Sequence, residues 1–426
     1  MTLFMSRCSR KQRFNFLTVH AWPVVLLLGS LLLTFSRPGL ASESVTRVYF
    51  GMHIHNADAG TAWPDLPFGA WRLWDAHVTW RDIQPEPARW AFKRLDRYVA
   101  MARITHTDLL LPLGLTPQWA SSRPLERSSY APGNAAEPRE LSDWQRYVEA
   151  VVRRYAGRIS AYEIWNEPNL SGFFSGDVDA MVRLTCEAYR IVKQADPKAI
   201  VVSPSATHQM EGIEWFELFL ERGGKKCFDV VGFHFYTLAH EPPEKIVPLA
   251  RKLHAVMEKH GIGKLPIWNT ESGWYIANRR IPVGVRWRVL NDEEAAAYVA
   301  RALILGWAEG IRRFYWYAWD DSKLGLLETE NGTLKPAARA YAKTARWMDN
   351  IHGITCKPSN QDVMVCQLDG QGKHDWIVWS MKQKTKFSIP PNWRSARIET
   401  LKGYTGKLHG HRLLELDGSP VLVSLE

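Results

Sequence analysis

The sequence predicts an α/β fold: a (β/α)8 TIM barrel followed by a small C-terminal antiparallel β-domain. Between residue 47 and about residue 350, eight short apolar runs alternate with longer amphipathic stretches. After about residue 350, only short alternating runs remain. Eight strands that are each followed by a helix imply a parallel sheet closed into a barrel, for which roughly 300 residues is an ordinary length.

The eight apolar runs have the length of barrel strands. They comprise residues 48–55, 70–75, 108–115, 159–166, 199–205, 228–236, 265–271 and 313–320. Helical periodicity is clear over residues 142–155, where Trp144 and Val148 fall on one face. The same periodicity predicts helices over residues 177–194, 243–260, 293–308 and 335–347.

The change in pattern divides the chain. Residues 42–350 are predicted to form the barrel and residues 351–426 a C-terminal β-domain. In this second segment the strand signals are separated by Gly, Pro and Asp turns. They cover residues 363–367, 375–381, 397–401 and 420–425.

The first 41 residues are predicted to be a signal peptide. A basic region ends near Arg13, fifteen apolar residues follow from Ala21 to Phe35, and Gly39-Leu40-Ala41 offers the small residues that a signal peptidase reads. Fifteen residues fall short of the roughly 20 that cross a bilayer. We expect export to the periplasm or beyond. The alternative is an uncleaved segment that anchors the chain to the membrane.

The net charge of +10 suggests a polyanionic partner until its location is considered. Residues 1–41 contain five basic residues and no acidic residue, so the remainder carries 49 basic and 44 acidic residues, a net charge of +5. Nucleic acid is therefore not an expected partner, because no basic patch stands out in the mature chain.

Four cysteines lie beyond the predicted signal peptide. An oxidising compartment would permit two disulfides, and pairing by domain would join Cys186 to Cys227 and Cys356 to Cys366. The sequence leaves this pairing open. No CxxC or HExxH motif occurs, so a zinc site is not expected.

Two glutamates follow or end predicted strands of the same barrel. One stands in Trp165-Asn166-Glu167-Pro168-Asn169, after the fourth run, and the other in Trp268-Asn269-Thr270-Glu271, at the end of the seventh. Catalytic residues of such barrels come from these strand ends. Pro168 predicts an extended backbone at Glu167. Like charge and desolvation raise the proton affinity of paired carboxylates, so the pair suits acid/base chemistry.

A lone glutamate at a strand end is more often a salt-bridge partner or a cap than a catalytic group. The occurrence of two, at strands four and seven, reverses that expectation. Glu163 has the same strand parity as Glu167 but lies deeper. We predict that it is an internal ion-pair partner of a barrel arginine.

This arrangement resembles the clan of retaining glycoside hydrolases, and further motifs are similar to glycoside hydrolase family 39. Those motifs are Gly51-Met52-His53-Ile54-His55, Arg72-Leu73-Trp74-Asp75, Pro117-Gln118-Trp119 and Gly232-Phe233-His234-Phe235-Tyr236. Within the family, exported endoglycosidases of the PslG type, encoded with bacterial exopolysaccharide clusters, look nearest. The resemblance implies a retaining O-glycosyl hydrolase without a cofactor.

The resemblance also implies residue roles. Glu271 would be the nucleophile and Glu167 the acid/base residue. Asn166 would bind the 2-hydroxyl of the sugar, and Tyr236 would orient Glu271. No metal is expected, since retaining glycosidases need none.

Four further residues are predicted to bind substrate. His53 and His234 would contact sugar hydroxyls, with metal binding or buried packing as alternatives. Trp119 and Trp319 would offer indole faces to sugar rings, with packing as the alternative. The expected partner is a polysaccharide or oligosaccharide, and the expected state is a monomer.

Three functions are compatible with these residues. The leading hypothesis is an exported endo-acting glycosidase of bacterial exopolysaccharide. An exo-acting β-xylosidase-like enzyme and a non-catalytic glycan-binding matrix protein are the alternatives.

Overall fold

The computed structural model describes residues 44–237, 241–278, 288–328, 330–370, 373–382, 384–393, 395–408 and 413–425. Residues 42–426 form one compact unit. The predicted signal peptide lies outside the described residues. Within the described ranges, no helix combines the length and the apolar character needed to span a membrane.

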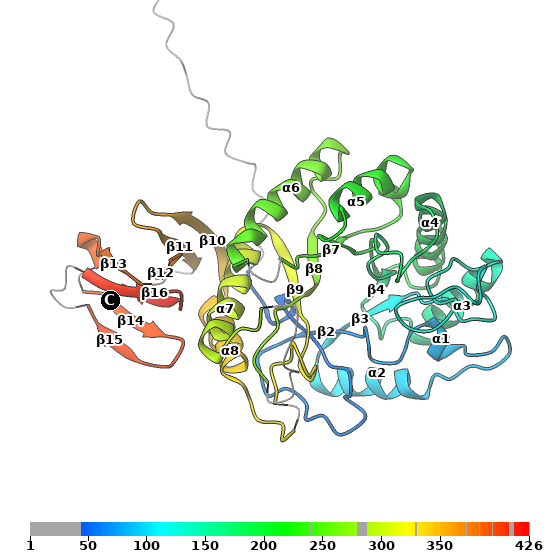
Figure 1. The fold of residues 1–426 in the computed structure, drawn as a ribbon, viewed down its shortest axis with the longest axis horizontal. Coiled ribbons are helices and arrows are strands. Elements are labelled where there is room, and N and C mark those ends of the chain that lie inside the picture. Colours follow the sequence, from blue (N-terminus) through cyan, green and yellow to red (C-terminus); the bar gives the residue numbers. More distant parts are fainter. Residues whose placement is uncertain are drawn as a thin grey trace, which may run out of the picture. The chain divides into compact units, whose positions relative to one another are not determined.

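A parallel sheet forms the centre of the molecule (Figure 1). Its strands are β1 (Phe50–His53), β2 (Ala70–Arg72), β3 (Asp108–Leu113), β4 (Ala161–Ile164), β5 (Ile200–Val202), β6 (Ala206–Thr207), β7 (Val231–His234), β8 (Ile267–Ser272) and β9 (Ile311–Trp316). The strand order is β5-β4-β3-β2-β1-β9-β8-β7-β6. Each of the eight predicted runs overlaps a strand of this sheet.

The strands β5 and β6 at the two ends of this order are halves of one barrel strand. Pro204, which has no N–H to donate, lies between them. β5 pairs with β4, β6 pairs with β7, and a parallel bridge joins Val202 to Val230. The sheet therefore closes, and the (β/α)8 barrel predicted from the sequence is confirmed.

Helices cover the outside of the barrel (Figure 1). They are α1 (Trp80–Ile83), α2 (Lys93–Thr105), α3 (Leu141–Tyr155), α4 (Val178–Ala195), α5 (Gly212–Glu221), α6 (Ile246–Lys259), α7 (Asp292–Ala308) and α8 (Pro336–Met348), with short 3-10 helices η1 (Arg47–Tyr49), η2 (Gly224–Lys226) and η3 (Pro243–Lys245). All five predicted helices are present. Their starts follow local chemistry: the Asp177 side chain, for example, accepts a hydrogen bond from Ala180 N–H and caps α4.

Two apolar layers hold the barrel. A small cluster of buried residues forms a core of its own; it comprises Ala70, Leu110, Ala161, Val202, Val230, Trp268 and Tyr315. A much larger cluster takes in the strands and the apolar faces of the helices. The polar side chains at the C-terminal ends of the strands are therefore held on rigid elements, as a catalytic site requires.

The C-terminal segment forms antiparallel sheets. Its strands are β10 (Ile351–Pro358), β11 (Val363–Gly370), β12 (Lys373–Ser380), β13 (Lys384–Ser388), β14 (Arg397–Thr400), β15 (Thr405–Lys407), β16 (Leu413–Asp417) and β17 (Val421–Ser424), with η4 (Pro391–Trp393). The predicted runs match β11, β12, β14 and β17. The other four were not predicted, because most of their residues are exposed or half-buried and they lack a clear period-two apolar pattern.

The β-domain packs on the barrel helices. β10 lies beside α7, and Trp379 Nε1 donates to Glu244 Oε1 at 2.7 Å. Lys343 of α8 pairs with Glu399 of β14. Disulfides join Cys186 to Cys227 and Cys356 to Cys366, which is the pairing expected by domain.

Candidate active site

Two carboxylates share the C-terminal mouth of the barrel. Glu271 is the fifth residue of β8, and Glu167 follows β4 by three residues. One ligand oxygen of each lies within 4.8 Å of the other. Retaining glycosidases place their carboxyl groups about 5–5.5 Å apart and inverting ones about 6.5–9.5 Å apart. The spacing therefore fits a double displacement.

The backbone at Glu167 differs from the sequence expectation. Its φ of 45° is left-handed, so the extended conformation predicted from Pro168 is wrong. Trp165, two residues earlier, also has a positive φ of 70°. The physical reason is tertiary: Glu167 N–H donates to the carbonyl of Ser205 at 2.9 Å, and Asn166 forms a parallel bridge with Ser205. These contacts to the next strand outweigh the local preference.

Arg72, the last residue of β2, connects the two carboxylate-bearing strands. It is fully buried. Its Nη1 donates to Glu271 Oε2 at 2.8 Å and its Nη2 donates to Asn166 Oδ1 at 2.7 Å. One guanidinium thus fixes the nucleophile candidate and the residue before the acid candidate. The sequence placed Arg72 in a motif but gave it no role.

Glu163 balances this buried charge from below. Arg72 Nε donates to Glu163 Oε2 at 2.6 Å, which confirms the predicted ion pair with a barrel arginine. The hydroxyl of Ser205 donates to Glu163 Oε1, and Thr270 Oγ1 donates to Ser205 Oγ at 2.9 Å. The network beneath the carboxylates therefore reaches from β2 across β4 to β8.

Tyr236 and His234 hold the two carboxylates from the side of β7. Tyr236 donates its hydroxyl to Glu271 Oε1 at 2.9 Å, the orientation predicted from the sequence. His234 Nδ1 lies 3.1 Å from Glu167 Oε1. Burial lowers the pKa of His234 to about 4, so this imidazole is neutral at neutral pH. It positions Glu167 without supplying a positive charge.

Burial raises the pKa of both Glu167 and Glu271 to about 7. Arg72 opposes this effect at both carboxyls, and the charge of Glu167 further raises the pKa of Glu271. Glu271 accepts hydrogen bonds from both Arg72 and Tyr236, which favour its ionised form. The proton that the pair retains near neutral pH therefore belongs on Glu167.

Asn166 is 1% exposed and directly precedes Glu167 in the chain. Its side-chain oxygen is occupied by Arg72, so its amide NH2 is the group left to donate to a ligand. This geometry suits the predicted contact with a sugar hydroxyl, and the contact stays a prediction.

Glu167, His234 and Glu271 offer ligand atoms that lie within 4.8 Å of one another, so this cluster could hold a metal ion. Arg72 already places a positive charge 2.8 Å from Glu271. A second cation beside it would be repelled. We therefore assign the cluster to acid/base chemistry.

His53 ends β1 and is fully buried. Its Nε2 lies 3.0 Å from the carbonyl oxygen of Thr270, which only accepts, so Nε2 carries the proton. Burial and the nearby Arg72 hold the pKa of His53 well below its usual value. Its Nδ1 is then an acceptor, and this atom has no hydrogen-bond partner among the described residues.

The two tryptophans proposed as sugar platforms are engaged within the protein. Trp319 is 2% exposed and donates its indole N–H to the carbonyl of Ala62 at 2.8 Å. Trp119 is half-buried and donates to the carbonyl of Gln84 at 2.9 Å. The predicted stacking of these rings on sugar stays a prediction.

Sequence reasoning missed a third carboxylate of the mouth. Asp75 follows β2 with a left-handed φ of 56°. Tyr130 donates to Asp75 Oδ1 at 2.6 Å and Tyr317 donates to Asp75 Oδ2 at 2.7 Å. The charge of Asp75 contributes to the raised pKa values of both Glu167 and Glu271. Its place in the Arg72-Leu73-Trp74-Asp75 motif was the available signal.

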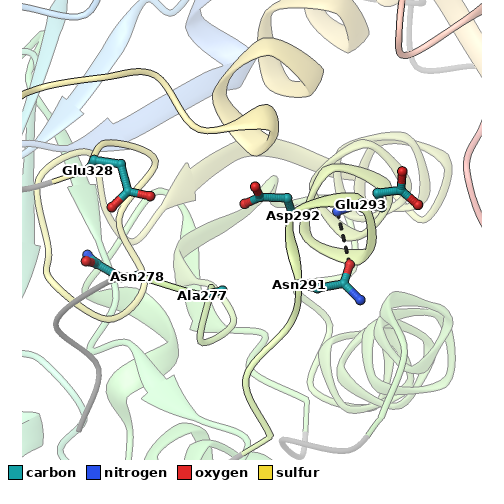
Figure 2. Close-up of a pocket in the computed structure, with 6 residues that line it drawn as sticks. All are labelled: Ala277, Asn278, Asn291, Asp292, Glu293 and Glu328. Atoms are coloured by element: carbon teal, nitrogen blue, oxygen red, sulfur yellow. Dashed lines mark hydrogen bonds between the residues drawn. The ribbon is translucent and has the colours of Figure 1, made fainter.

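A separate pocket of about 640 Å³ lies by the start of α7 (Figure 2). Its lining comprises Ala277, Asn278, Asn291, Asp292, Glu293 and Glu328. Asn291 Oδ1 accepts from the N–H groups of Glu293 and Glu294, and acidic side chains occupy the first helical turn. Asn291 and the acidic residues of the first turn serve to begin α7.

A closed (β/α)8 barrel with paired glutamates at strands four and seven, set at close spacing, defines the class of retaining glycoside hydrolases. Residues 70–304 match the family model described as glycosyl hydrolases family 39. The chain belongs to this family.

Known proteins agree with this assignment. A β-xylosidase of Geobacillus stearothermophilus is 25% identical over 256 residues, which cover 54% of this chain and 48% of the relative. The chain thus spans about half the length of that curated relative. A family 39 glycoside hydrolase of Bacteroides cellulosilyticus has a TM-score of 0.70 at 18% identity, covering 90% of this chain and 82% of its own.

A monomeric β-xylosidase of Caulobacter crescentus has a similar fold. Its TM-score is 0.60 at 17% identity, and the match covers 91% of this chain and 97% of that chain. At this identity the likeness concerns the fold alone.

Proposed function

We propose that this protein is an exported retaining glycosidase that cleaves a polysaccharide internally, with bacterial exopolysaccharide as its substrate class. The observation that supports it most is the spacing of Glu167 and Glu271, whose oxygens lie within 4.8 Å. Membership of family 39 supports the hydrolase activity. The internal mode of cleavage and the exopolysaccharide follow from the resemblance of the sequence motifs to PslG-type endoglycosidases.

The residues divide the reaction between them. Glu271, held ionised by Arg72 and Tyr236, attacks the anomeric carbon. Glu167 gives its proton to the departing glycosidic oxygen. Glu167 then accepts a proton from the water that hydrolyses the glycosyl-enzyme, and this second inversion gives overall retention.

Export is supported by chemistry within the described chain. Two disulfides are characteristic of oxidising compartments, in agreement with a cleaved signal peptide that ends at Ala41. An N-terminal segment that stays uncleaved would anchor the same enzyme at the membrane. We expect the enzyme to act as a monomer.

The decisive experiment is product analysis on exopolysaccharide of the producing organism. Wild type should release oligosaccharides, and Glu167→Ala and Glu271→Ala should release none. NMR of the first product should show the anomer of the substrate. Equal activity of Glu271→Ala would overturn the assignment. Glycan binding without any product from wild type would favour a matrix-binding protein.

A second candidate is an exo-acting β-xylosidase-like enzyme, which the Geobacillus β-xylosidase favours at 25% identity. Release of monosaccharide from the non-reducing end, and turnover of an aryl β-xyloside, would select it over the internal mode of cleavage.

A further inference from the structure

Asp75, Tyr130 and Tyr317 form a cluster that no step of the proposed reaction uses. All three are half-buried and belong to the mouth of the barrel. They come from the segments that follow β2, β3 and β9. We refer to them as the Asp75 cluster.

The cluster offers acceptors only. Both tyrosines direct their hydroxyl protons at Asp75, at 2.6 Å and 2.7 Å. Burial and the Asp75 charge raise the pKa of both hydroxyls, so they keep these protons. A carboxylate has about four lone-pair sites and each tyrosine oxygen retains its own, so a ligand that meets this cluster must donate hydrogen bonds.

His53 adds an acceptor from the neighbouring strand. Its ring packs edge-on against Tyr317, with centroids 5.0 Å apart. Its Nδ1 is buried and has no protein partner in the part of the chain that the structure describes. A buried acceptor without a partner costs free energy unless a ligand or water satisfies it. The unpartnered Nδ1 is an independent indication that a ligand donates a hydrogen bond beside the Asp75 cluster.

The position of the cluster identifies the part of the substrate that it meets. His53, Asp75 and Tyr317 belong to β1, β2 and β9 or to the segments that follow them, and these three strands are neighbours in the sheet. Tyr130 reaches Asp75 from the segment after β3, and Glu167 follows β4 on the far side of β3. The acid protonates the leaving group, so the leaving group lies on the Glu167 side. The sector of β9, β1 and β2 then faces the glycone, the sugar that Glu271 attacks.

We propose that the Asp75 cluster, together with His53, is a glycone subsite that reads sugar hydroxyl groups and selects an uncharged glycone over a uronic acid. The inference rests on the proposed function, since it names the substrate class of the same site. A uronate carboxylate here would be repelled by the Asp75 carboxylate, and Asp75, Tyr130, Tyr317 and His53 have no free hydrogen-bond donor to offer it. A neutral sugar offers hydroxyl donors to these acceptors and carries no negative charge for Asp75 to repel.

The selectivity is tested by binding, separately from turnover. In a Glu167→Gln background, saturation-transfer NMR titrations with glucose, xylose and glucuronate measure affinity without hydrolysis. We expect the better neutral sugar to bind at least ten-fold more tightly than glucuronate. Asp75→Asn should weaken binding of the better neutral sugar about ten-fold to a hundred-fold, because the amide replaces an acceptor by a donor. It should also reduce the preference for that sugar over glucuronate.

Two controls keep the test sharp. Tyr130→Phe removes one acceptor oxygen and keeps the ring, so it should weaken binding of the neutral sugar about three-fold to ten-fold even if Asp75→Asn fails to fold. Asp96→Asn is the matched control, because Asp96 also accepts a tyrosine hydroxyl, that of Tyr155, but lies on the outer helix α2. It should leave all three affinities unchanged.

Equal binding of glucuronate and the neutral sugars, unchanged affinity in both Asp75→Asn and Tyr130→Phe, or no binding of any of the three sugars would overturn the subsite. None of these results would touch the assignment of Glu167 and Glu271, which the product analysis decides. Conversely, an inactive wild type that shows the predicted sugar preference would refute the hydrolase activity and would support the sugar-binding subsite.

Discussion

Arg72 Nε lies 2.6 Å from Glu163 Oε2, and both side chains are completely buried beneath the candidate catalytic pair. This contact divides the charge of one guanidinium between a structural carboxylate and Glu271. A buried ion pair is costly to form and costlier to break on one side, because the remaining charge loses its partner. The pair therefore links the stability of the barrel to the placement of the nucleophile.

Replacing Glu163 by glutamine should destabilise the fold strongly. The substitution leaves Arg72 with one carboxylate in place of two, and removal of one partner of a buried pair costs about 3–5 kcal/mol. Urea denaturation should show a loss of unfolding free energy near the lower end of this range, because glutamine keeps a hydrogen-bond acceptor. Glu149→Gln is the control: its pair with Arg153 is exposed and should contribute less than about 1 kcal/mol. Equal losses in the two variants would contradict the role of the buried pair.

The activity of the enzyme should follow a bell-shaped pH profile centred near neutrality. Glu271 must be ionised and Glu167 protonated, and burial raises the pKa of each to about 7. Interaction between the two separates the apparent pKa values to either side of that region. Activity should fall at acid pH as Glu271 gains its proton, and at alkaline pH as Glu167 loses its own. The measurement is kcat/KM against pH.

The same profile offers an internal check. With a substrate whose leaving group needs no protonation, Glu167→Gln should lose the alkaline limb and keep the acid limb. If Glu167→Gln lost the acid limb and kept the alkaline limb, Glu167 would be the nucleophile and Glu271 the acid/base residue.

Glu167→Gln should also stabilise the protein at high pH. A carboxyl whose pKa is raised by folding, from 4.5 to about 7, binds protons more tightly in the folded state. Stability is therefore lost as the pH rises from about 4.5 to about 7, and the loss is complete above that range. Glutamine is neutral throughout, so the variant should melt above wild type at pH 8, with a much smaller difference at pH 4. Melting curves at the two pH values decide this, and a constant difference would argue against a charged Glu167.

Tyr236→Phe should impair the reaction while the fold persists. The variant removes the hydroxyl that donates to Glu271 Oε1 at 2.9 Å, and a hydrogen bond to a charged group contributes about 1.5–3 kcal/mol. We expect kcat/KM to fall roughly ten-fold to a hundred-fold. Tyr147→Phe is the matched control, because the buried hydroxyl of Tyr147 has no partner within the described ranges. An unaffected Tyr236→Phe enzyme would exclude the orienting role.

Much of the architecture followed from local pattern. Apolar runs and helical periodicity predicted the strands and the main helices, because burial of one face imposes a period on the sequence. The exposed strands β13 and β16 were not predicted, because each has only one buried residue in five and so shows no such period. The split of the fifth barrel strand at Pro204 was likewise visible only once β6 was seen to pair with β7.

By itself, the sequence determined the barrel, the positions of Glu167 and Glu271 at its strand ends, and an internal ion-pair role for Glu163. Tertiary structure decided what surrounds them. The left-handed backbone of Glu167 depends on the carbonyl of Ser205, 38 residues later in the chain. The triple contact of Arg72 and the meeting of Tyr130 and Tyr317 at Asp75 join residues from separate strands and loops. Such contacts leave no period in the sequence, because they arise only when the closed barrel brings its strand ends together.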